Sequence, residues 1–170
     1  GKKVTYALFS HHNGDVIVKN ARYAHRVFGG FITGKIIDSA IVGGLCFIAM
    51  TIFQFPYPPL ISVIIGVANV IPFFGPYIGA IPSILLILLV DPLQALYFLI
   101  FILVLQQIEG NIIAPKVLGE ATGLTGFWVI FSIVVFGGTM GFVGLIIGVP
   151  AFAVIYTWIK NWITRRLQKK

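Results

Sequence analysis

Charged side chains are scarce in this sequence, and acidic ones are scarcest. Only 10% of the 170 residues are charged, with 5 Asp and Glu against 12 Lys and Arg. A soluble domain normally carries about 25% charged residues. Hydrophobic residues make up 58% of the chain, more than a water-soluble fold of this length can bury. The composition therefore excludes an ordinary soluble domain.

Long stretches of the chain contain no charge at all. Residues 60–90 and 121–159 lack Asp, Glu, Lys and Arg. A spanning helix needs about 20 mainly apolar residues. These stretches are apolar at consecutive positions, without the alternation of a barrel strand. We therefore predict an all-α fold, a polytopic transmembrane helical bundle with broken or re-entrant helices.

Catalytic and metal-binding patterns are also missing. The single cysteine excludes a disulfide within the chain. The sequence has no H-E-x-x-H, no G-x-S-x-G, no P-loop and no dinucleotide-binding fingerprint. Its histidines lie at one polar end, without a constellation of metal ligands. We expect no enzyme, no cofactor and no metal site.

Basic residues are present, but they gather at the two ends of the apolar region. The net charge of +7 would suit a nucleic-acid partner, yet this placement is typical of membrane orientation signals. We expect the lipid bilayer and no nucleic acid as a partner, with both ends in the cytoplasm. The basic residues are Lys19, Arg22, Arg26 and Lys35 at one end, and Lys160, Arg165, Arg166, Lys169 and Lys170 at the other.

Three regions follow from these patterns. Residues 1–35 form an amphipathic interfacial segment, because apolar and basic positions alternate through Asp15–Lys35 and predict an N-terminal interfacial helix. Residues 36–163 form a transmembrane transport domain, which begins with a span at Ile36–Phe55. Within that span Gly43 and Gly44 indicate close contact with another helix. Residues 164–170 form a basic cytoplasmic tail.

Two dense helix breaks interrupt the apolar region. The first is Ile71–Pro76, which contains Pro72, Gly75 and Pro76, and the second is Gly137–Gly141, which contains Gly137, Gly138 and Gly141. Bare backbone is costly in lipid and persists only inside protein or beside a water-filled cavity. We predict that both segments are non-helical and face an interior. A packing kink without a ligand is the alternative.

The number of crossings is constrained by the two basic ends. Both ends in the cytoplasm require an even number of crossings, whereas we count five apolar segments. Leu124–Phe136 is too short to span and is our first candidate for a re-entrant half-helix. The alternative is that the interrupted segment Leu60–Val90 folds as a hairpin.

A weak internal likeness links the two breaks. Gly75-Pro-Tyr-Ile-Gly-Ala-Ile-Pro82 resembles Gly144-Leu-Ile-Ile-Gly-Val-Pro150, with an offset of one residue at the proline. Transporters often contain repeats with broken helices at corresponding positions. Two apolar segments rich in glycine and proline can also match by chance.

The most polar cluster of the apolar region follows the helix that starts at Asp91-Pro92. Glu109 ends that helix, where the helix dipole disfavours a negative charge, and ionisable groups at membrane depth usually mark substrate or proton pathways. We predict that Glu109, Gln107, Asn111, Gln106 and Asn69 bind a small solute or a monovalent cation. The alternative places Glu109 at the aqueous interface.

Asp38 lies near the start of the first predicted span, close to Lys35. We interpret it as an interfacial cap or as one half of an ion pair. Ser62, Ser83, Ser132 and Thr139 are interpreted as polar groups that pack helices together.

Three motifs in order carry a resemblance to a known family. They are Asn69-Val-Ile-Pro-Phe-Phe-Gly-Pro76 with Pro82, Gln107-Ile-Glu-Gly-Asn111 with Pro115 and Gly119, and Gly137-Gly138 with Gly141, Gly144 and Pro150. This series resembles the autoinducer-2 exporter family of bacterial membrane transporters and covers the chain from about Gly34 onward. Family members are about twice this length with about eight spanning helices, so the resemblance implies a C-terminal half.

The resemblance implies a multi-pass protein of the bacterial plasma (inner) membrane and a homo-oligomer, with a pentamer as the implied assembly. It also implies secondary transport, either as an exporter or as a cation/proton antiporter, without selecting the substrate. Two other functions remain open. A passive channel would need rings of polar groups, and a non-transporting oligomeric scaffold could use the glycine-rich helix faces.

Overall fold

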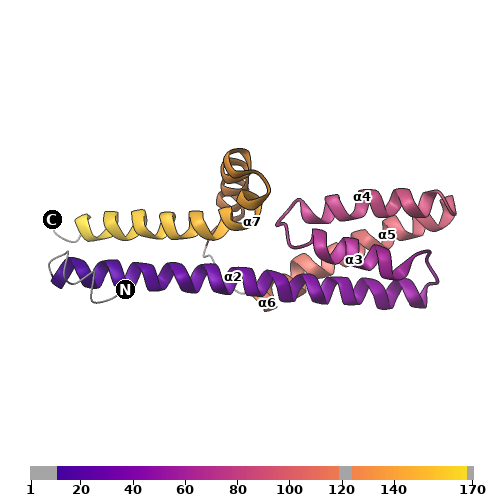
Figure 1. Cartoon of the computed structure of the whole chain (residues 1–170), viewed down its shortest axis with the longest axis horizontal. Helices are drawn as coiled ribbons and strands as arrows, with labels where there is room; N and C mark the ends of the chain where they lie inside the picture. The colour runs from indigo at the N-terminus through magenta and orange to yellow at the C-terminus, as the bar shows by residue number, and fades with distance from the viewer. Residues whose placement is uncertain (1–10, 119–123, 168–170) are drawn as a thin grey trace. The chain divides into compact units, whose positions relative to one another are not determined.

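The computed structural model describes residues 11–118 and 124–167 (Figure 1). Within those two ranges the chain forms helices and no strand, as the all-α prediction requires. The ends of the predicted interfacial segment and of the basic tail, residues 1–10 and 168–170, lie outside the described residues. The elements are α2 (His11–Ile52), α3 (Pro58–Ala68), α4 (Gly75–Leu88), α5 (Pro92–Ile108), the π-helix η1 (Glu109–Ile113), α6 (Ala114–Leu118) and α7 (Gly126–Leu167).

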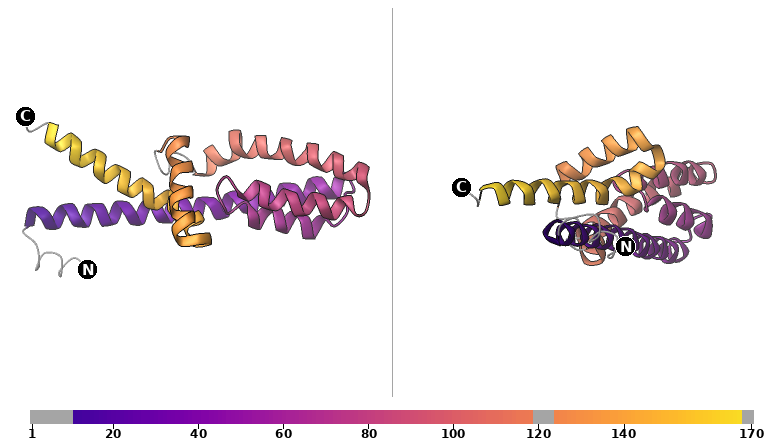
Figure 2. Two further views of the ribbon diagram at one scale, coloured as in Figure 1. Left: turned by 90° about the horizontal axis from the view of Figure 1, so that it is seen from above. Right: turned by 60° about the vertical axis from the view of Figure 1, so that its left-hand side comes forward.

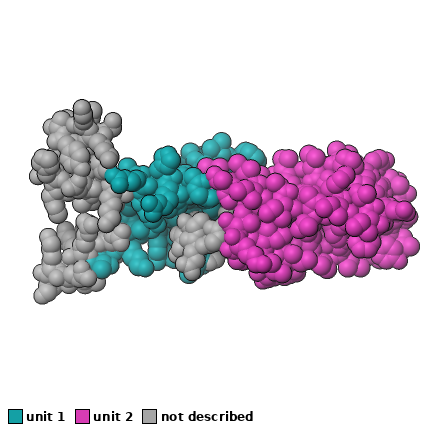
Figure 3. Space-filling model, turned by 90° about the horizontal axis from the view of Figure 1, so that it is seen from below, with its two compact units in different colours: residues 1–31, 121–170 teal, residues 32–120 magenta. Residues whose placement is uncertain are grey.

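The chain divides into two compact units (Figure 3). Unit 1 comprises residues 1–31 and 121–170, and unit 2 comprises residues 32–120. Helix α2 contributes residues to both units, and the predicted boundary after Lys35 falls inside it.

Unit 2 packs the second part of α2 with α3, α4 and α5 around one apolar core. Helix α5 begins as predicted, because Asp91 Oδ1 accepts hydrogen bonds from the N–H groups of Leu93 and Gln94 at 2.8 Å and 3.3 Å. Pro92 takes the first helical position, where its missing N–H costs nothing. The buried core residues are Val42, Cys46, Met50, Phe55, Ile61, Ile65, Ile87, Ala95, Phe98, Ile102, Leu105 and Ile113.

Helices α2 and α3 touch through their glycines. A Cβ atom added at Gly43 would lie 3.3 Å from Gly66 Cα and 3.3 Å from the Ser62 carbonyl oxygen. Small residues at such a crossing let two backbones approach closely, as in membrane helix pairs. The predicted close contact is confirmed at Gly43, whereas Gly44 faces open space.

Helices α3 and α4 form a hairpin, named hairpin A here, and run back along each other (Figure 1). A Cβ atom at Gly75 would overlap the carbonyl oxygen of Ala68, and one at Gly79 would lie 3.2 Å from Ile65 Cα. The two helices have 11 and 14 residues, about 16 Å and 21 Å at 1.5 Å per residue. Each is shorter than the hydrocarbon core of about 30 Å. The hairpin alternative for residues 60–90 is confirmed.

Helix α7 also folds back on itself and forms hairpin B (Figure 2, right). Its backbone turns at Gly141, with φ of 60° and ψ of −139°, a region essentially reserved for glycine. A Cβ atom at Gly144 would overlap the carbonyl oxygen of Phe136, and one at Gly148 would lie 3.2 Å from the Ser132 carbonyl oxygen. The predicted half-helix Leu124–Phe136 contributes most of the first arm.

The exact positions of both breaks differ from the prediction. Gly75 and Pro76 belong to the first turn of α4, because proline is tolerated before helical hydrogen bonding is established. Gly137 and Gly138 are helical, and the break in α7 lies at Gly141. Gly137 instead leaves room for the side chain of Leu145 on the returning arm. Pro72 lies in the non-helical turn between α3 and α4, as predicted.

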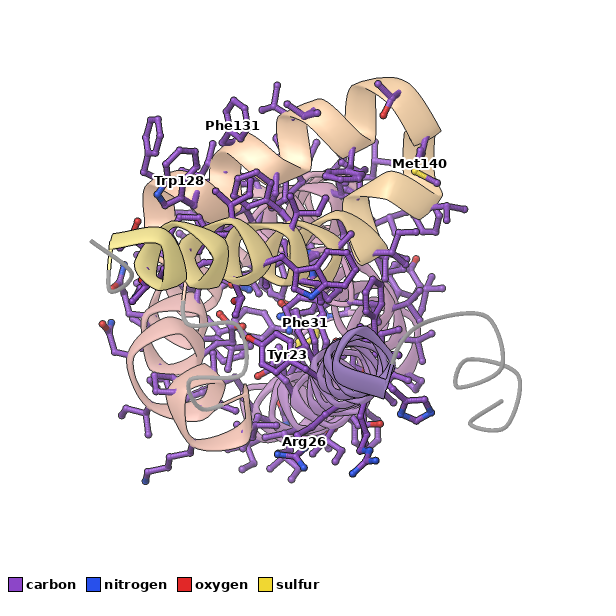
Figure 4. All side chains as sticks on the ribbon, turned by 90° about the vertical axis from the view of Figure 1, so that its left-hand side faces the viewer. Tyr23, Arg26, Phe31, Trp128, Phe131 and Met140 are labelled. Atoms are coloured by element: carbon purple, nitrogen blue, oxygen red, sulfur yellow. The ribbon has the colours of Figure 1, made fainter. Side chains whose placement is uncertain are left out.

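The amphipathic pattern of the first segment is confirmed within unit 1. Tyr23, Val27 and Phe31 lie four residues apart, so they share one face of α2. Val27 packs with Ala153 and Val154 of α7, and the Tyr23 hydroxyl lies 3.1 Å from Thr157 Oγ1. Figure 4 shows Tyr23 and Phe31 on the side of α2 that faces α7, with Arg26 on the opposite side. The apolar face therefore packs on protein, and its interfacial position stays a prediction.

In the part of the chain that the structure describes, three helical segments are long and apolar enough to cross a membrane. They are Ala21–Ile52, Pro92–Val117 and Phe127–Lys160, the last of which contains the Gly141 turn. Among the described residues the apolar surface is extensive, with exposed side chains such as Ile52, Val67 and Leu89. Such a surface is typical of a protein whose solvent is lipid.

Candidate functional site

Four polar side chains of unit 2 meet in one buried cluster, called the charge cluster below: Lys35, Asp38, Asn69 and Glu109. Lys35 Nζ donates to Asp38 Oδ2 at 2.7 Å and to Glu109 Oε1 at 3.3 Å. Asn69 Nδ2 donates to the same Asp38 Oδ2 at 3.2 Å. One carboxylate oxygen therefore joins an ammonium group and an amide.

Each member is placed by a different local feature of the chain. Lys35 and Asp38 are three residues apart on α2 and so share one face of that helix. Asn69 follows the last residue of α3 at the turn of hairpin A. Glu109 is the first residue of the π-helix. The cluster thus joins a long apolar helix, a hairpin turn and a helix irregularity.

The π-helix is a correction to the sequence prediction. We expected Glu109-Gly110-Asn111 to end the helix, but the chain stays helical through α6. The N–H of Ala114 donates to the Glu109 carbonyl oxygen, five residues back. One wider turn lets the helix continue into α6 although Pro115 has no N–H to donate. Such turns occur frequently at functional sites.

Burial is nearly complete around this cluster. The side chain of Asp38 has no exposed area, and those of Lys35 and Glu109 are 9% and 12% exposed. Ionised groups taken out of water must be paired and hydrogen-bonded, because their desolvation is expensive. Here one ammonium group faces two carboxyl groups, so the three side chains together carry one uncompensated negative charge when all three are ionised.

Two buried oxygen atoms of the cluster accept no hydrogen bond from the described residues. They are Asp38 Oδ1 and Asn69 Oδ1, on side chains of residues that are 0% and 1% exposed. Leaving a buried polar atom unpaired costs about 1–3 kcal/mol, and more when the group is charged. This pair is therefore a place where a positively charged or hydrogen-donating ligand would be favourable.

The predicted site residues divide into two groups. Glu109 and Asn69 belong to the charge cluster, linked through Lys35 and Asp38. Gln107 and Asn111 are exposed, and Asn111 Nδ2 donates to the backbone oxygen of Gln107 at 2.8 Å and to its Oε1 at 3.2 Å.

Asn111 therefore has a local structural role. Its side chain supplies a hydrogen bond to a carbonyl near the wide π turn. Gln106 has a buried Nε2 atom without a partner among the described residues. Binding of a ligand by Gln106, Gln107 or Asn111 stays a prediction.

Lys35 and Asp38 are members of the site that the sequence prediction did not include. The ion pair between them is confirmed, but we placed it at the start of a span and took Lys35 as an orientation signal. The structure puts both midway along the apolar segment Ala21–Ile52. The available signal was an acid three residues after a base, with apolar sequence continuing on both sides.

The serines and Thr139 form hydrogen bonds within their own helices, and their predicted part in packing helices together stays a prediction. Ser62, Ser83 and Ser132 each donate to a backbone oxygen three or four residues earlier, at 2.7 Å. Thr139 does the same toward Val135 at 2.9 Å. These hydroxyl groups are therefore satisfied within their own helices.

The chain combines long apolar helices, two hairpins built on glycine contacts, and ionisable side chains within a segment apolar enough to span a membrane. These are the features of helical membrane transport proteins, whose discontinuous helices surround polar sites.

Comparison with known proteins agrees with this class. Residues 3–164 match the family described as AI-2E family transporter. "Putative transport protein YrrI" of Bacillus subtilis is 33% identical over 140 residues, which cover 82% of this chain and 40% of that protein. "Putative transport protein YueF" of the same organism is 29% identical over 131 residues, covering 77% and 36%. "Putative transport protein YhhT" of Escherichia coli is 23% identical over 141 residues, covering 81% and 40%.

This chain belongs to the AI-2E transporter family, which confirms the resemblance found in its motifs. It is a membrane protein of a transport family. The chain spans about 40% of the length of the curated relatives that it matches. No solved structure matches it.

Proposed function

We propose that the full-length protein is a secondary transporter of a small solute or a monovalent cation, working as an exporter or as a cation/proton antiporter. The protein passes several times through the bacterial plasma (inner) membrane, with both basic ends in the cytoplasm. It assembles as a homo-oligomer, for which the family resemblance implies a pentamer.

The observation that carries this proposal is the charge cluster beside the turn of hairpin A. Lys35, Asp38 and Glu109 are ionisable and buried within segments apolar enough to span a membrane. Stability alone does not account for such a cluster, because apolar residues of similar volume would often serve as well or better. Ionisable groups in this setting typically mark ion and substrate pathways.

Hairpin A supplies the second requirement of a transporter, a place where backbone leaves the helix near the site. Asn69 ends α3 there and joins the cluster through its hydrogen bond to Asp38. In transporters, rocking or gating of one part against another exposes such a site to each side in turn. Any movement of α3 or α4 would change the distance between Asn69 and Asp38 and so alter the cluster.

The other functions make different predictions. A passive channel lowers the free-energy barrier but cannot drive accumulation, so it equilibrates a solute whatever ion gradient is imposed. A non-transporting scaffold gives no flux. An enzyme is not proposed, since the family to which the chain belongs is one of transporters.

The test is flux into proteoliposomes that contain the full-length protein. Radiolabelled sodium serves as the cation probe, and an entrapped pH-sensitive dye reports protons. We expect an imposed pH gradient to drive sodium against its own concentration gradient, with proton movement in the opposite direction. Flux that only dissipates a gradient would instead make the protein a channel, and absence of flux would favour the scaffold.

A matched pair of variants assigns the flux to the cluster. Asp38→Asn removes a buried carboxylate of the cluster and should reduce the initial rate by about tenfold or more, the equivalent of one lost charge-assisted interaction. Asp91→Asn removes a carboxylate that caps the other end of α5 and should leave most of the rate. Equal rates in the two variants would contradict the assignment.

A further inference from the structure

We propose that Asp38 and Asn69 form a binding site for one monovalent cation, which is either an alkali metal ion or a proton. The proposal rests on the proposed function, because it names the coupling ion of the same cluster. Of the binding residues predicted from the sequence it keeps Asn69, and Asp38 takes the place of Glu109, Gln106, Gln107 and Asn111.

Charge counting supplies the first argument. When ionised, Lys35, Asp38 and Glu109 sum to one negative charge, and none of the three side chains is more than 12% exposed. The other charged side chains that the structure describes in unit 2 are Asp91, at the opposite end of α5, and the exposed Lys116. Neither forms an ion pair with the cluster among the described residues. One further positive charge would make the cluster neutral.

Geometry supplies the second argument and selects Asp38. Its Oδ2 atom already accepts from Lys35 at 2.7 Å and from Asn69 at 3.2 Å, whereas its Oδ1 atom has no partner among the described residues. Asn69 Oδ1 is likewise buried and unpartnered. The Asn69 amide is held by donating to Asp38, which leaves its oxygen as an acceptor belonging to the same cluster.

The chemistry of these two atoms fits a small cation. A carboxylate oxygen and an amide oxygen are hard ligands of the kind that alkali ions accept, and unwound backbone at a helix end commonly completes such sites. A proton on Asp38 Oδ1 would satisfy the same charge deficit through a neutral carboxyl group. His, Cys, Asp and Glu are not grouped as a multivalent metal site would require in the described part of the chain.

Lys35 acts in this arrangement as a fixed internal cation. Its ammonium group neutralises one carboxylate, so the cluster requires one added charge rather than two. Removal of Lys35 should therefore increase the dependence on added cations, and removal of either carboxylate should abolish it. A purely structural ion pair would not show this pattern.

The experiment measures binding in detergent with the full-length protein and does not depend on transport. Thermal unfolding is followed in NaCl, LiCl and KCl against choline chloride at equal ionic strength, and across pH in choline chloride. A ligand that binds only the folded state stabilises it by RT ln(1 + [L]/Kd) and therefore raises the unfolding midpoint. For wild type we expect a rise of about 3 °C or more with an alkali cation or with acid.

Five variants test the charge count, four of them in the cluster and one outside it. Asp38→Asn and Glu109→Gln each leave a neutral cluster and should lose the shift. Lys35→Gln leaves two negative charges and should enlarge it. The double variant Lys35→Gln/Glu109→Gln restores one negative charge and should restore the shift, while Asp91→Asn should retain the wild-type shift.

The outcomes distinguish a metal ion from a proton as the added positive charge. A shift with alkali cations identifies a metal ion, and a shift with acid alone identifies a proton, provided that Asp38→Asn abolishes it. A wild-type shift in Asp38→Asn overturns the proposal, as does a folded double variant without a shift. If Lys35→Gln does not fold, the single carboxylate variants still decide the matter.

The proposal and the proposed function can fail separately. A shift that follows the charge count in a protein without gradient-driven flux would keep the cation site and reject the transporter. Gradient-driven flux in a protein whose midpoint ignores cations and acid would keep the transporter and reject this site.

Discussion

Hairpins A and B are built alike and differ in what surrounds them. In each, the first glycine of the second helix lies against a carbonyl oxygen of the first helix, Gly75 on Ala68 and Gly144 on Phe136. The turn of hairpin A contains Asn69, which belongs to the charge cluster. Hairpin B instead carries an aromatic group in which Trp128 stacks on Phe152 with ring centroids 5.4 Å apart.

The two hairpins share a mode of helix packing and differ in their polar contacts. A pattern of glycines four residues apart specifies how closely two helices pack, and both hairpins obey it. Neither hairpin carries a charged side chain, because residues 60–90 and 121–159 contain none, but Asn69 at the turn of hairpin A donates a hydrogen bond to Asp38. We therefore expect substitutions that disturb the helix packing to destabilise both hairpins to a similar extent. We expect only those in hairpin A to alter ion binding.

The largest expected effect comes from filling the glycine contacts. Gly75→Ala and Gly144→Ala place a methyl group on a backbone oxygen, so each should destabilise the protein by about 3 kcal/mol. Thermal unfolding of the full-length protein measures the loss. Gly44→Ala and Gly138→Ala are the matched controls, since a Cβ there meets nothing within 4 Å. If Gly75→Ala had wild-type stability, the two hairpins would not depend on the same kind of glycine contact.

An intermediate effect is expected at the two turns. Gly141 has positive φ in hairpin B, and Phe73 has a φ of 63° in hairpin A. Gly141→Ala should cost about 1–3 kcal/mol, because a side chain is strained in that conformation. Phe73→Gly relieves strain and adds backbone freedom, so its effect should stay within about 1 kcal/mol. Unfolding midpoints that rank the two variants in the opposite order would refute this account of the turns.

The smallest effect is expected from the helix hydroxyl groups. Ser62 in hairpin A and Ser132 in hairpin B each donate to a carbonyl of their own helix. Ser62→Ala and Ser132→Ala should each change stability by less than about 1 kcal/mol. Denaturation of the purified variants tests this, and a much larger loss at one serine would reveal a bond between helices at that position.

The sequence predicted much of the architecture for identifiable reasons. Asp91-Pro92 is a local helix start that needs no tertiary information. Pro56 between α2 and α3, and Pro72 in the turn after Asn69, mark interruptions because proline removes a backbone donor. The likeness between the segments that begin at Gly75 and Gly144 corresponds to a shared mode of packing, because each glycine lies against a carbonyl oxygen of the preceding helical segment.

The exact break in α7 could not be read from composition. Gly137, Gly138 and Gly141 are equally permissive, and only packing of the returning arm places the turn at the last of them. The π-helix was missed for a related reason. Gly110 and Pro115 are helix-ending signals, but one wider turn lets the helix continue past them.

The candidate site was predicted in part. Glu109 stood out because a carboxylate is unusual at the end of an apolar helix. Its partners lie 74 and 71 positions away in Lys35 and Asp38, and helix periodicity carries no information about such distant contacts. Gln107 and Asn111 are close in sequence to Glu109, yet both are exposed.

The central claim is that the charge cluster couples transport to a cation, and Glu109→Gln tests it most directly. This substitution keeps the shape of the side chain and removes its charge. The measurement is the initial rate of gradient-driven sodium flux across a range of pH, with membrane insertion and assembly checked and Asp91→Asn as the control. We predict a rate at least about tenfold below wild type and a changed pH dependence. A wild-type rate with the wild-type pH dependence would contradict the claim.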